Sequence, residues 1–319
     1  MLNKRDIRTF SMLGSRRTFW LKITEAADEN LIVMTADLGK GNGLEKFQQN
    51  FPEQFLNVGI AEQNMIGIAA GLSKVGLNVF ATTFSTFITS RCFDQVRVNL
   101  GYMNLPVKLV GRGSGICNGV AGATHYAVED FALMRTIPEM IVVAPADALE
   151  TAKVATAAVT SNSPMYIRLT DGVNIPMVYK EDYNFELGKA NVLREGEDLT
   201  IFATGSMVYP SLKAAELLAE KNISAAVVNF HTIKPLDYET LEKYSAERKF
   251  IFTVEEHSEI GGLSSAVAEF FADKISPPQI KIALPDSYVK AGEYNFLLDK
   301  YGLTAESICA KITQRIQRN

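Results

Sequence analysis

Short apolar runs alternate with amphipathic stretches along most of this chain of 319 residues. In the first half the runs lie at 31–35, 78–82, 107–110, 141–144 and 165–169, and each has the length and composition of a β-strand. Strands that are apolar almost throughout and that alternate with helices are typical of a mostly parallel sheet covered on both faces. The sequence therefore predicts an α/β fold.

The stretches between these runs have the spacing of helices. Candidate helices lie at 61–74, 86–100, 126–136 and 147–160. Asp147 is a suitable N-cap for the last of them, and Glu150 three residues later completes the pattern of a capping box.

The alternation is interrupted between residues 171 and 197, where Pro176, Gly188, Gly196 and several charges are typical of a linker. A second series follows, with candidate strands at 199–203, 225–229, 250–254 and 280–283 and candidate helices at 209–220, 263–272, 294–300 and 304–315. We therefore expect two domains, at 1–175 and 196–319, joined by a linker at 176–195. Each domain is expected to contain a mostly parallel sheet flanked by helices.

Charge and composition exclude several classes of function. A net charge of −4, with 21% charged and 47% hydrophobic residues, gives no general attraction to nucleic acid or to an anionic membrane. The longest apolar runs, near 66–72 and 140–146, are too short to cross a bilayer. The first residues contain no apolar signal core, so we expect a cytoplasmic protein.

Cysteine and histidine are scarce in the sequence. The three cysteines are scattered and form no cluster with the spacing of metal ligands, so we expect reduced thiols and no metal site built from this chain. Imidazole chemistry is limited to His125, His231 and His257.

One acid, Glu62, stands in a run of small and apolar residues from Asn57 to Gly71, where a loop is expected to become a helix. On spacing alone it could be a first-turn acid that interacts favourably with the helix dipole, worth under about 1 kcal/mol. The segment from Met65 to Gly71 carries no charge, however, which favours a buried helix. A buried carboxylate needs a partner and shifts toward its protonated form, in which it can donate a hydrogen bond to a ring nitrogen.

Further candidates follow predicted strands, where ligand crevices form in parallel sheets. They are Asp37 and Leu38 after the first strand, Phe84 and Phe87 after the next, and His125 after a glycine-rich loop. Structural roles are open for all of them: a turn for Asp37, core packing for the aromatic pair, and a structural imidazole for His125.

The run that contains Glu62 resembles the glutamate-bearing segment of the pyrimidine-binding domain in transketolases and deoxyxylulose-phosphate synthases. In those enzymes the acid activates thiamine diphosphate. The chain lacks the Gly-Asp-Gly and the later Asn that anchor the diphosphate and its metal in the same families. From about Ser15 to Arg315 it is similar to the C-terminal subunit of a split transketolase, in which a pyrimidine-binding domain precedes a transketolase C-terminal domain.

The resemblance implies cofactor contacts for several residues. Glu62 would activate the cofactor, and Asp37 and Leu38, in a segment similar to Ser-Ala-Asp-Leu, would lie against it. Counted without a gap, Phe87 matches the phenylalanine that stacks on the aminopyrimidine in deoxyxylulose-phosphate synthases. With a gap as in transketolases Phe84 matches instead, and Phe87 is the preferred candidate.

The resemblance also implies substrate contacts for His125, Arg16 and Arg168. His125 matches a transketolase histidine that contacts the sugar and can assist proton transfer. Arg16, in Ser15-Arg-Arg17, resembles an arginine that binds the substrate phosphate. The second phosphate arginine of the family aligns with Asp171, so Arg168 is the remaining candidate.

Other positions depart from the family pattern. Asp171 replaces an arginine, Gly41 replaces a serine near the phosphate, and Ala121 replaces an aspartate in the loop before His125. A carboxylate at 171 would repel a phosphate. The chemical group at the end of the sugar therefore stays open, and a sulfonate, a free sugar and an unphosphorylated ketose are all candidates.

The resemblance implies a thiamine diphosphate site shared with a separate subunit that carries the diphosphate-binding domain, in a two-plus-two heterotetramer. Mg²⁺ or Ca²⁺ would be held mainly by that partner through oxygen ligands. The implied reaction transfers a two-carbon ketol unit from a ketose, a sugar phosphate or related anionic sugar, to an aldose, as in the pentose phosphate pathway.

Two other functions stay open at this stage. The β subunit of a 2-oxo acid dehydrogenase pairs the same two domains, but the segment Thr124-His-Tyr-Ala-Val-Glu-Asp130 and the run from Val58 favour a transketolase. A noncatalytic scaffold is the other alternative, against which the intact Glu62 and Phe87 argue.

Overall fold

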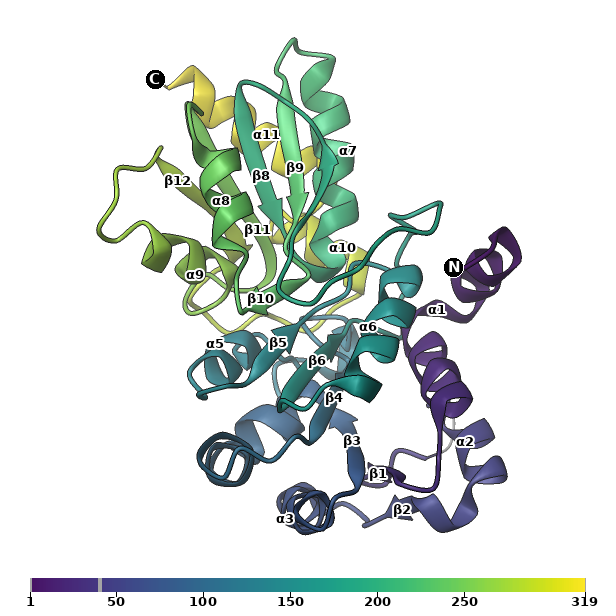
Figure 1. Ribbon diagram of the computed structural model, residues 1–319. Coiled ribbons are helices and arrows are strands. Elements are labelled where there is room, and N and C mark those ends of the chain that lie inside the picture. The colour runs from purple at the N-terminus through teal and green to yellow at the C-terminus, as the bar shows by residue number, and fades with distance from the viewer. Residues whose placement is uncertain (1, 40–41, 319) are drawn as a thin grey trace.

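The computed structural model describes residues 2–39 and 42–318, which form two α/β units that lie one above the other in the view of Figure 1. The N-terminal unit, purple to teal, contains most of the larger sheet, and the C-terminal unit, green to yellow, contains the smaller one. No helix in the described parts of the chain is long and apolar enough to cross a lipid bilayer.

The first sheet has seven strands in the order β10-β5-β6-β4-β3-β1-β2. They are β1 (Leu31–Thr35), β2 (Phe55–Asn57), β3 (Asn78–Phe84), β4 (Lys108–Arg112), β5 (Ile141–Val143), β6 (Met165–Leu169) and β10 (Thr232–Lys234). Strands β1 to β6 pair in the parallel direction, and β10 pairs with β5 in the antiparallel direction. The carboxyl ends of the parallel strands therefore meet at one edge of the sheet.

Helices cover both faces of this sheet, as its nearly continuous burial requires. On one face lie α1 (Lys4–Ala26), α2 (Glu45–Asn50) and α6 (Ala148–Thr160), around an aromatic core of Phe19, Trp20, Phe47 and Phe80. On the other face lie α3 (Glu62–Lys74), α4 (Phe93–Val96) and α5 (Asp130–Arg135). Turns of π-helix at Phe87–Arg91 and Arg97–Tyr102 flank α4.

The second sheet has five strands in the order β12-β11-β8-β9-β7. They are β7 (Asn191–Arg194), β8 (Leu199–Ala203), β9 (Ala225–Asn229), β11 (Phe250–Ser258) and β12 (Gln279–Leu284). Their covering helices are α7 (Val208–Ala219), α8 (Tyr238–Ser245), α9 (Leu263–Phe270), α10 (Tyr294–Lys300) and α11 (Ala305–Gln317). β7 pairs with β9 in the antiparallel direction, and the other pairs are parallel.

The two units are joined by shared secondary structure and by a shared core. β10 leaves the C-terminal unit and pairs with β5, where Thr232 lies opposite Val143. The backbone N–H of Ala144 donates to the carbonyl of His231 at 2.7 Å. A single hydrophobic cluster also runs from α3 and α5 into α8 and α9. The position of the second unit is therefore fixed by main-chain hydrogen bonds as well as by packing.

The predicted fold class is confirmed, and each candidate strand and helix is present with shifts at its ends. The sequence did not predict α1, α2, α8, β2 or β10. The predicted linker at 176–195 is also not without structure, because its last residues form β7. Short strands such as β2 and β10 carry little local signal, since neighbouring strands supply most of their hydrogen bonds.

The predicted capping box at α6 is half correct. The Asp147 side chain accepts the N–H of Glu150 at 2.8 Å, as expected for an N-cap. The Glu150 carboxylate does not return to the N–H of Asp147 but accepts from the N–H of Ala146 and from the amide of Asn229 in β9. Glu150 therefore links the two units instead of closing the box.

Candidate active site

The candidate residues gather at the carboxyl edge of the first sheet. The parallel register places Phe84 beside Arg112, and Arg112 beside Leu169, at the ends of three neighbouring strands. The loops that leave these strands carry Phe87, His125 and Asp171. Loops of this kind form the ligand crevice of parallel α/β sheets.

Glu62 is the first residue of α3 and is 4% exposed. Its Oε1 lies 2.8 Å from Nη1 of Arg91, at the end of the π-helical turn after β3. Arg91 supplies the partner that a buried carboxylate requires. Sequence reasoning missed this arginine, although its position four residues after Phe87 put both side chains on one helical face.

Phe84, Phe87 and His125 form a compact group of rings. The ring centroids are 5.7 Å apart for the phenylalanine pair, and the His125 ring lies 5.8 Å from Phe84 and 5.4 Å from Phe87, all edge to face. The Arg91 guanidinium covers Phe87 at 4.0 Å from the ring centre. A continuous path of contacts therefore runs from Glu62 through Arg91 and Phe87 to His125.

Cys92 follows Arg91 and lies close to the same acid. Burial, and then the negative charge of Glu62, raise the pKa of its thiol to about 12, against the lowering effect of Arg91. Cys92 is therefore a neutral thiol at physiological pH and packs as a small apolar side chain. Among the described residues, no group of three or more His, Cys, Asp or Glu side chains could hold a metal ion.

Asp37 and Leu38 lie at the end of β1, next to β3 in the sheet. Asp37 has a positive φ of 59°, and its N–H donates to the side chain of Asn57 at 3.0 Å. The N–H of Leu38 donates to the hydroxyl of Thr35 at 3.3 Å. A non-glycine residue with positive φ has a strained backbone conformation. Such strain is more frequent at functional sites than elsewhere.

Arg16 and Asp171 form an ion pair that was not predicted. α1 is kinked at Gly14, where φ is 71°, and its second part brings Nη1 of Arg16 to 2.9 Å from Oδ2 of Asp171. Nε of Arg112 lies 3.4 Å from the same oxygen, and the N–H of Gly113 donates to Oδ1 at 2.7 Å. The carboxylate at 171 is thus neutralised within the chain.

Arg112 is a second residue that sequence reasoning missed. Its guanidinium lies 4.9 Å from the ring centre of Phe84, and Nη1 donates to the side chain of Asn42. Burial lowers the pKa of Arg112, and Asp171 opposes that shift. Its position at the carboxyl end of β4, where ligand crevices form, was the sequence signal that could have identified it. Gly41, another departure from the family pattern, lies outside the described residues.

The prediction that Arg168 contacts substrate is corrected by the structure. Arg168 is 2% exposed, and its Nε donates to Oδ2 of Asp130 at 2.7 Å. Nη2 donates to the carbonyls of Ala127 and Glu256 at 3.1 and 2.8 Å. Strand alternation turns Arg168 away from Asp171 and into the contact between the two units.

The loop that carries His125 is held by the C-terminal unit. Glu256, in β11, accepts the N–H of Ile116 at 2.7 Å and the hydroxyls of Ser206 and Tyr294. Within the loop, the amide of Asn118 donates to the carbonyl of His125 at 3.1 Å. The C-terminal unit therefore helps to set the position of the candidate substrate histidine.

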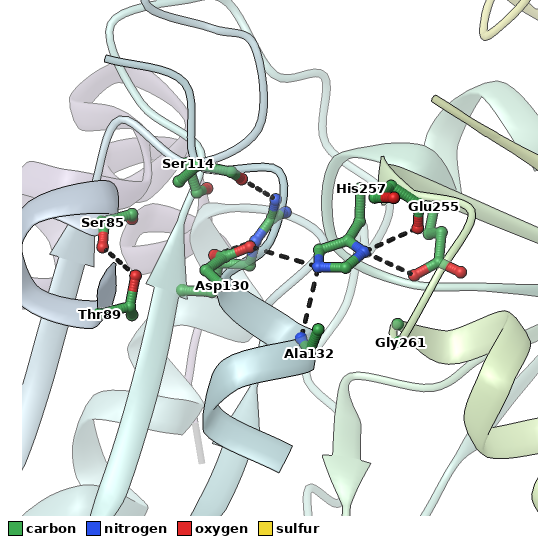
Figure 2. A network of polar contacts seen from close by, with 12 residues as sticks. Ser85, Thr89, Ser114, Asp130, Ala132, Glu255, His257 and Gly261 are labelled. Atoms are coloured by element: carbon green, nitrogen blue, oxygen red, sulfur yellow. Dashed lines mark hydrogen bonds and ion pairs between the residues drawn. The ribbon is translucent and has the colours of Figure 1, made fainter. Parts of the chain in front are cut away.

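A buried polar network lies behind this loop, at the contact of the two units. Figure 2 shows His257 between Asp130 and Glu255, with the N–H of Ala132 directed at its ring. The ring nitrogens lie 3.9 Å from each carboxylate, and Ala132 donates at 3.4 Å. His257 also stacks on Phe131 at 5.2 Å, so it joins the two units and does not face the crevice.

Comparison with known proteins agrees with this geometry. Residues 21–173 match the transketolase pyrimidine-binding domain, and residues 188–308 match the transketolase C-terminal domain. One subunit of the apulose-4-phosphate transketolase of Phocaeicola vulgatus is 38% identical over 97% of this chain and 99% of its own length. The chain belongs to the split transketolases. It corresponds to their C-terminal subunit.

Other split transketolases show the same correspondence. The 6-deoxy-6-sulfo-D-fructose transketolase subunit SqwH of Clostridium sp. is 38% identical over 88% of this chain and 87% of its own length. A solved structure described as a split gene transketolase, inactive beta4 tetramer, is 40% identical and superposes with a TM-score of 0.86 over 94% of this chain. Membership in this thiamine-dependent family implies thiamine diphosphate as the cofactor.

Proposed function

We propose that this split transketolase subunit supplies the pyrimidine side of the cofactor site and, with its partner, transfers a two-carbon ketol unit from a ketose to an aldose. The observation that carries the proposal is the continuous contact from Glu62 through Arg91 and Phe87 to His125. It brings together an acid, an aromatic face and an imidazole, which suit an aminopyrimidine and a ketose carbonyl.

Each residue then has a distinct task. Glu62 would hydrogen-bond the aminopyrimidine nitrogen, and Phe87, with Phe84 beside it, would hold the ring. Asp37 and Leu38, at the end of the neighbouring strand β1, would also contact the cofactor. When bound, thiamine diphosphate supplies the electron sink for the carbon–carbon bond that is broken and made.

His125 and Arg16 would bind the sugar substrate. His125 holds a hydroxyl or carbonyl of the sugar and can move a proton there, because its ring lies at the edge of both phenylalanines. Arg16 contributes positive charge toward the tail of a sugar phosphate or related anionic sugar.

The partner is an N-terminal subunit that carries the diphosphate-binding domain, and the working assembly is a two-plus-two heterotetramer. Two relatives of nearly the same length are themselves named as transketolase subunits, which supports a division of the active site between two chains. Mg²⁺ or Ca²⁺ would bind mainly to oxygen ligands of the partner. A pentose phosphate role and a cytoplasmic location stay predictions.

The test is reconstitution with candidate N-terminal subunits, including the product of any adjacent reading frame. We expect ketol transfer from the complex and none from this chain alone. Glu62→Ala should lower turnover by roughly 100-fold or more. Glu53→Ala, an exposed acid just before β2, is the matched control and should keep full turnover. Turnover by the single chain, or normal turnover of Glu62→Ala in the complex, contradicts the proposal.

A further inference from the structure

Asp171 stands between the two arginines that border the proposed substrate site. Its side chain is 3% exposed, and its Oδ2 contacts Arg16 at 2.9 Å and Arg112 at 3.4 Å. Its Oδ1 accepts the N–H of Gly113 at 2.7 Å. Both oxygens are therefore committed to groups of the chain, and Asp171 acts on a ligand through its charge.

Among the described residues, Asp171 and the two arginines in contact with it together carry one net positive charge. Two guanidinium groups carry two, and Asp171 removes one. Nε of Arg16 is buried and has no hydrogen-bond acceptor among the described residues, and Nε of Arg112 has only the long 3.4 Å contact with Asp171. Buried donors of this kind usually have a partner, so an acceptor from a ligand would complete the arrangement.

The cluster lies within reach of the group that holds the rest of the sugar. Arg112 contacts the ring of Phe84 at 4.9 Å, and Phe84 contacts His125 at 5.8 Å. A cavity of about 280 Å³, lined by residues 11–17 and 170–175, lies beside Arg16 and Asp171. A ketose whose carbonyl lies near His125 therefore extends its tail past Phe84 toward the arginines.

We propose that Asp171 is a specificity-determining residue, which makes this split transketolase prefer a donor with a monoanionic tail, such as a sulfonate, over one with a phosphate dianion. This inference rests on the proposed function. A sulfonate carries one negative charge, which matches the single net positive charge of the cluster. A phosphate ester carries between about 1.5 and 2 negative charges at neutral pH. The excess negative charge would be repelled by the carboxylate of Asp171.

The experiment uses the reconstituted complex with three donors of one carbon skeleton: 6-deoxy-6-sulfofructose, fructose 6-phosphate and fructose. We expect kcat/KM to be highest for the sulfonate, roughly tenfold above the phosphate. Asp171→Asn keeps the shape and removes the charge, so it should raise kcat/KM for the phosphate by roughly tenfold and change the sulfonate much less. Asp273→Asn, an exposed aspartate far along the chain, is the control and should change none of the three.

A wild type that prefers the phosphate or fructose would overturn the proposal. An Asp171→Asn protein that loses activity on all donors in equal proportion would also overturn it, because Asp171 would then only support the fold. If the variant does not fold, the wild type decides by its pH dependence. The phosphate-to-sulfonate ratio of kcat/KM should fall between about pH 5.5 and 7.5, as the ester gains its second charge, and a constant ratio would overturn the proposal.

Cofactor binding separates this inference from the proposed function. Thiamine diphosphate is first titrated into the complex. A complex that does not bind it contradicts the proposed function. A complex that binds it and transfers ketol units only from donors other than these three contradicts the role of Asp171.

Discussion

At the scale of single residues, the candidate site depends on buried carboxylates that are paired with arginines. Glu62 has Arg91, and Asp171 has Arg16 and Arg112. Removing one member of such a pair leaves the other charge without a partner, which costs more than the pair contributes. The arginines therefore matter for the fold as well as for the proposed site.

Arg91→Met tests this pairing. We expect a loss of about 1–2 kcal/mol in the free energy of unfolding, since Glu62 is buried while Arg91 is partly exposed. In the complex, thiamine diphosphate affinity should also fall, because Phe87 loses the guanidinium that covers it. Chemical denaturation and cofactor titration measure both effects. Arg97→Met, in an exposed pair with Asp94, is the control, and equal effects from the two variants would count against a special role for Arg91.

At the scale of elements, the loop from Gly113 to Ala127, which carries the candidate His125, is positioned by β11 of the other unit. Burial raises the pKa of Glu256, although Arg168 and three hydrogen-bond donors favour its charged form. Gly115 has a φ of 64°, and a Cβ there would overlap the Glu256 carboxylate. Only glycine allows this close approach of the loop to the acid. The C-terminal unit thus positions the loop that carries His125.

Glu256→Gln should therefore act as a positioning variant. Replacing one acceptor by a donor disturbs the contacts to Ile116, Ser206 and Tyr294. We expect KM for the donor sugar to rise by roughly tenfold, with cofactor affinity nearly unchanged, because the loop carries His125 and not Glu62. Glu259→Gln, just beyond the end of the same strand, should leave KM unchanged. A parallel loss of cofactor binding would point to a general structural defect.

At the scale of the whole molecule, β10 and the polar networks make the two units into one body. His231 lies at the junction of β9 and β10, fully buried, with Nδ1 2.8 Å from the hydroxyl of Thr232 and its ring against Phe185. Burial lowers the pKa of His231 to about 4, against a weaker opposing effect of Asp237. The unfolded chain binds this proton at higher pH than the folded chain does.

Stability should therefore fall as the pH falls from about 6.5 to about 4, because the unfolded state takes up the proton first. Over that range the wild type should lose about 3 kcal/mol relative to His231→Gln. Asp147, whose pKa burial raises to about 6, titrates in the same window, but it is common to both proteins and cancels in the difference. Denaturation of both proteins at several pH values measures this, and a difference that does not vary with pH would contradict it.

The local sequence determined the secondary-structure alternation, the α/β class and the candidates Glu62, Phe84, Phe87 and His125. The alternation and the fold class follow from composition and period, which act over one or two turns of chain. The four candidates follow from short motifs that resemble those of transketolases. The tertiary structure decided the partners of those residues. Arg16 and Asp171 are 155 positions apart and meet because α1 packs beside the end of β6.

The same reason explains what the sequence could not determine. Arg168 has the residue type of a substrate clamp, but the C-terminal unit supplies its partners and buries it. Arg112 and Asp171 carry opposite charges at the ends of neighbouring strands, and only the sheet order brings them together. Ion pairs between distant segments depend on topology, because the free energy of a charge is set by what surrounds it and not by its neighbours in the chain.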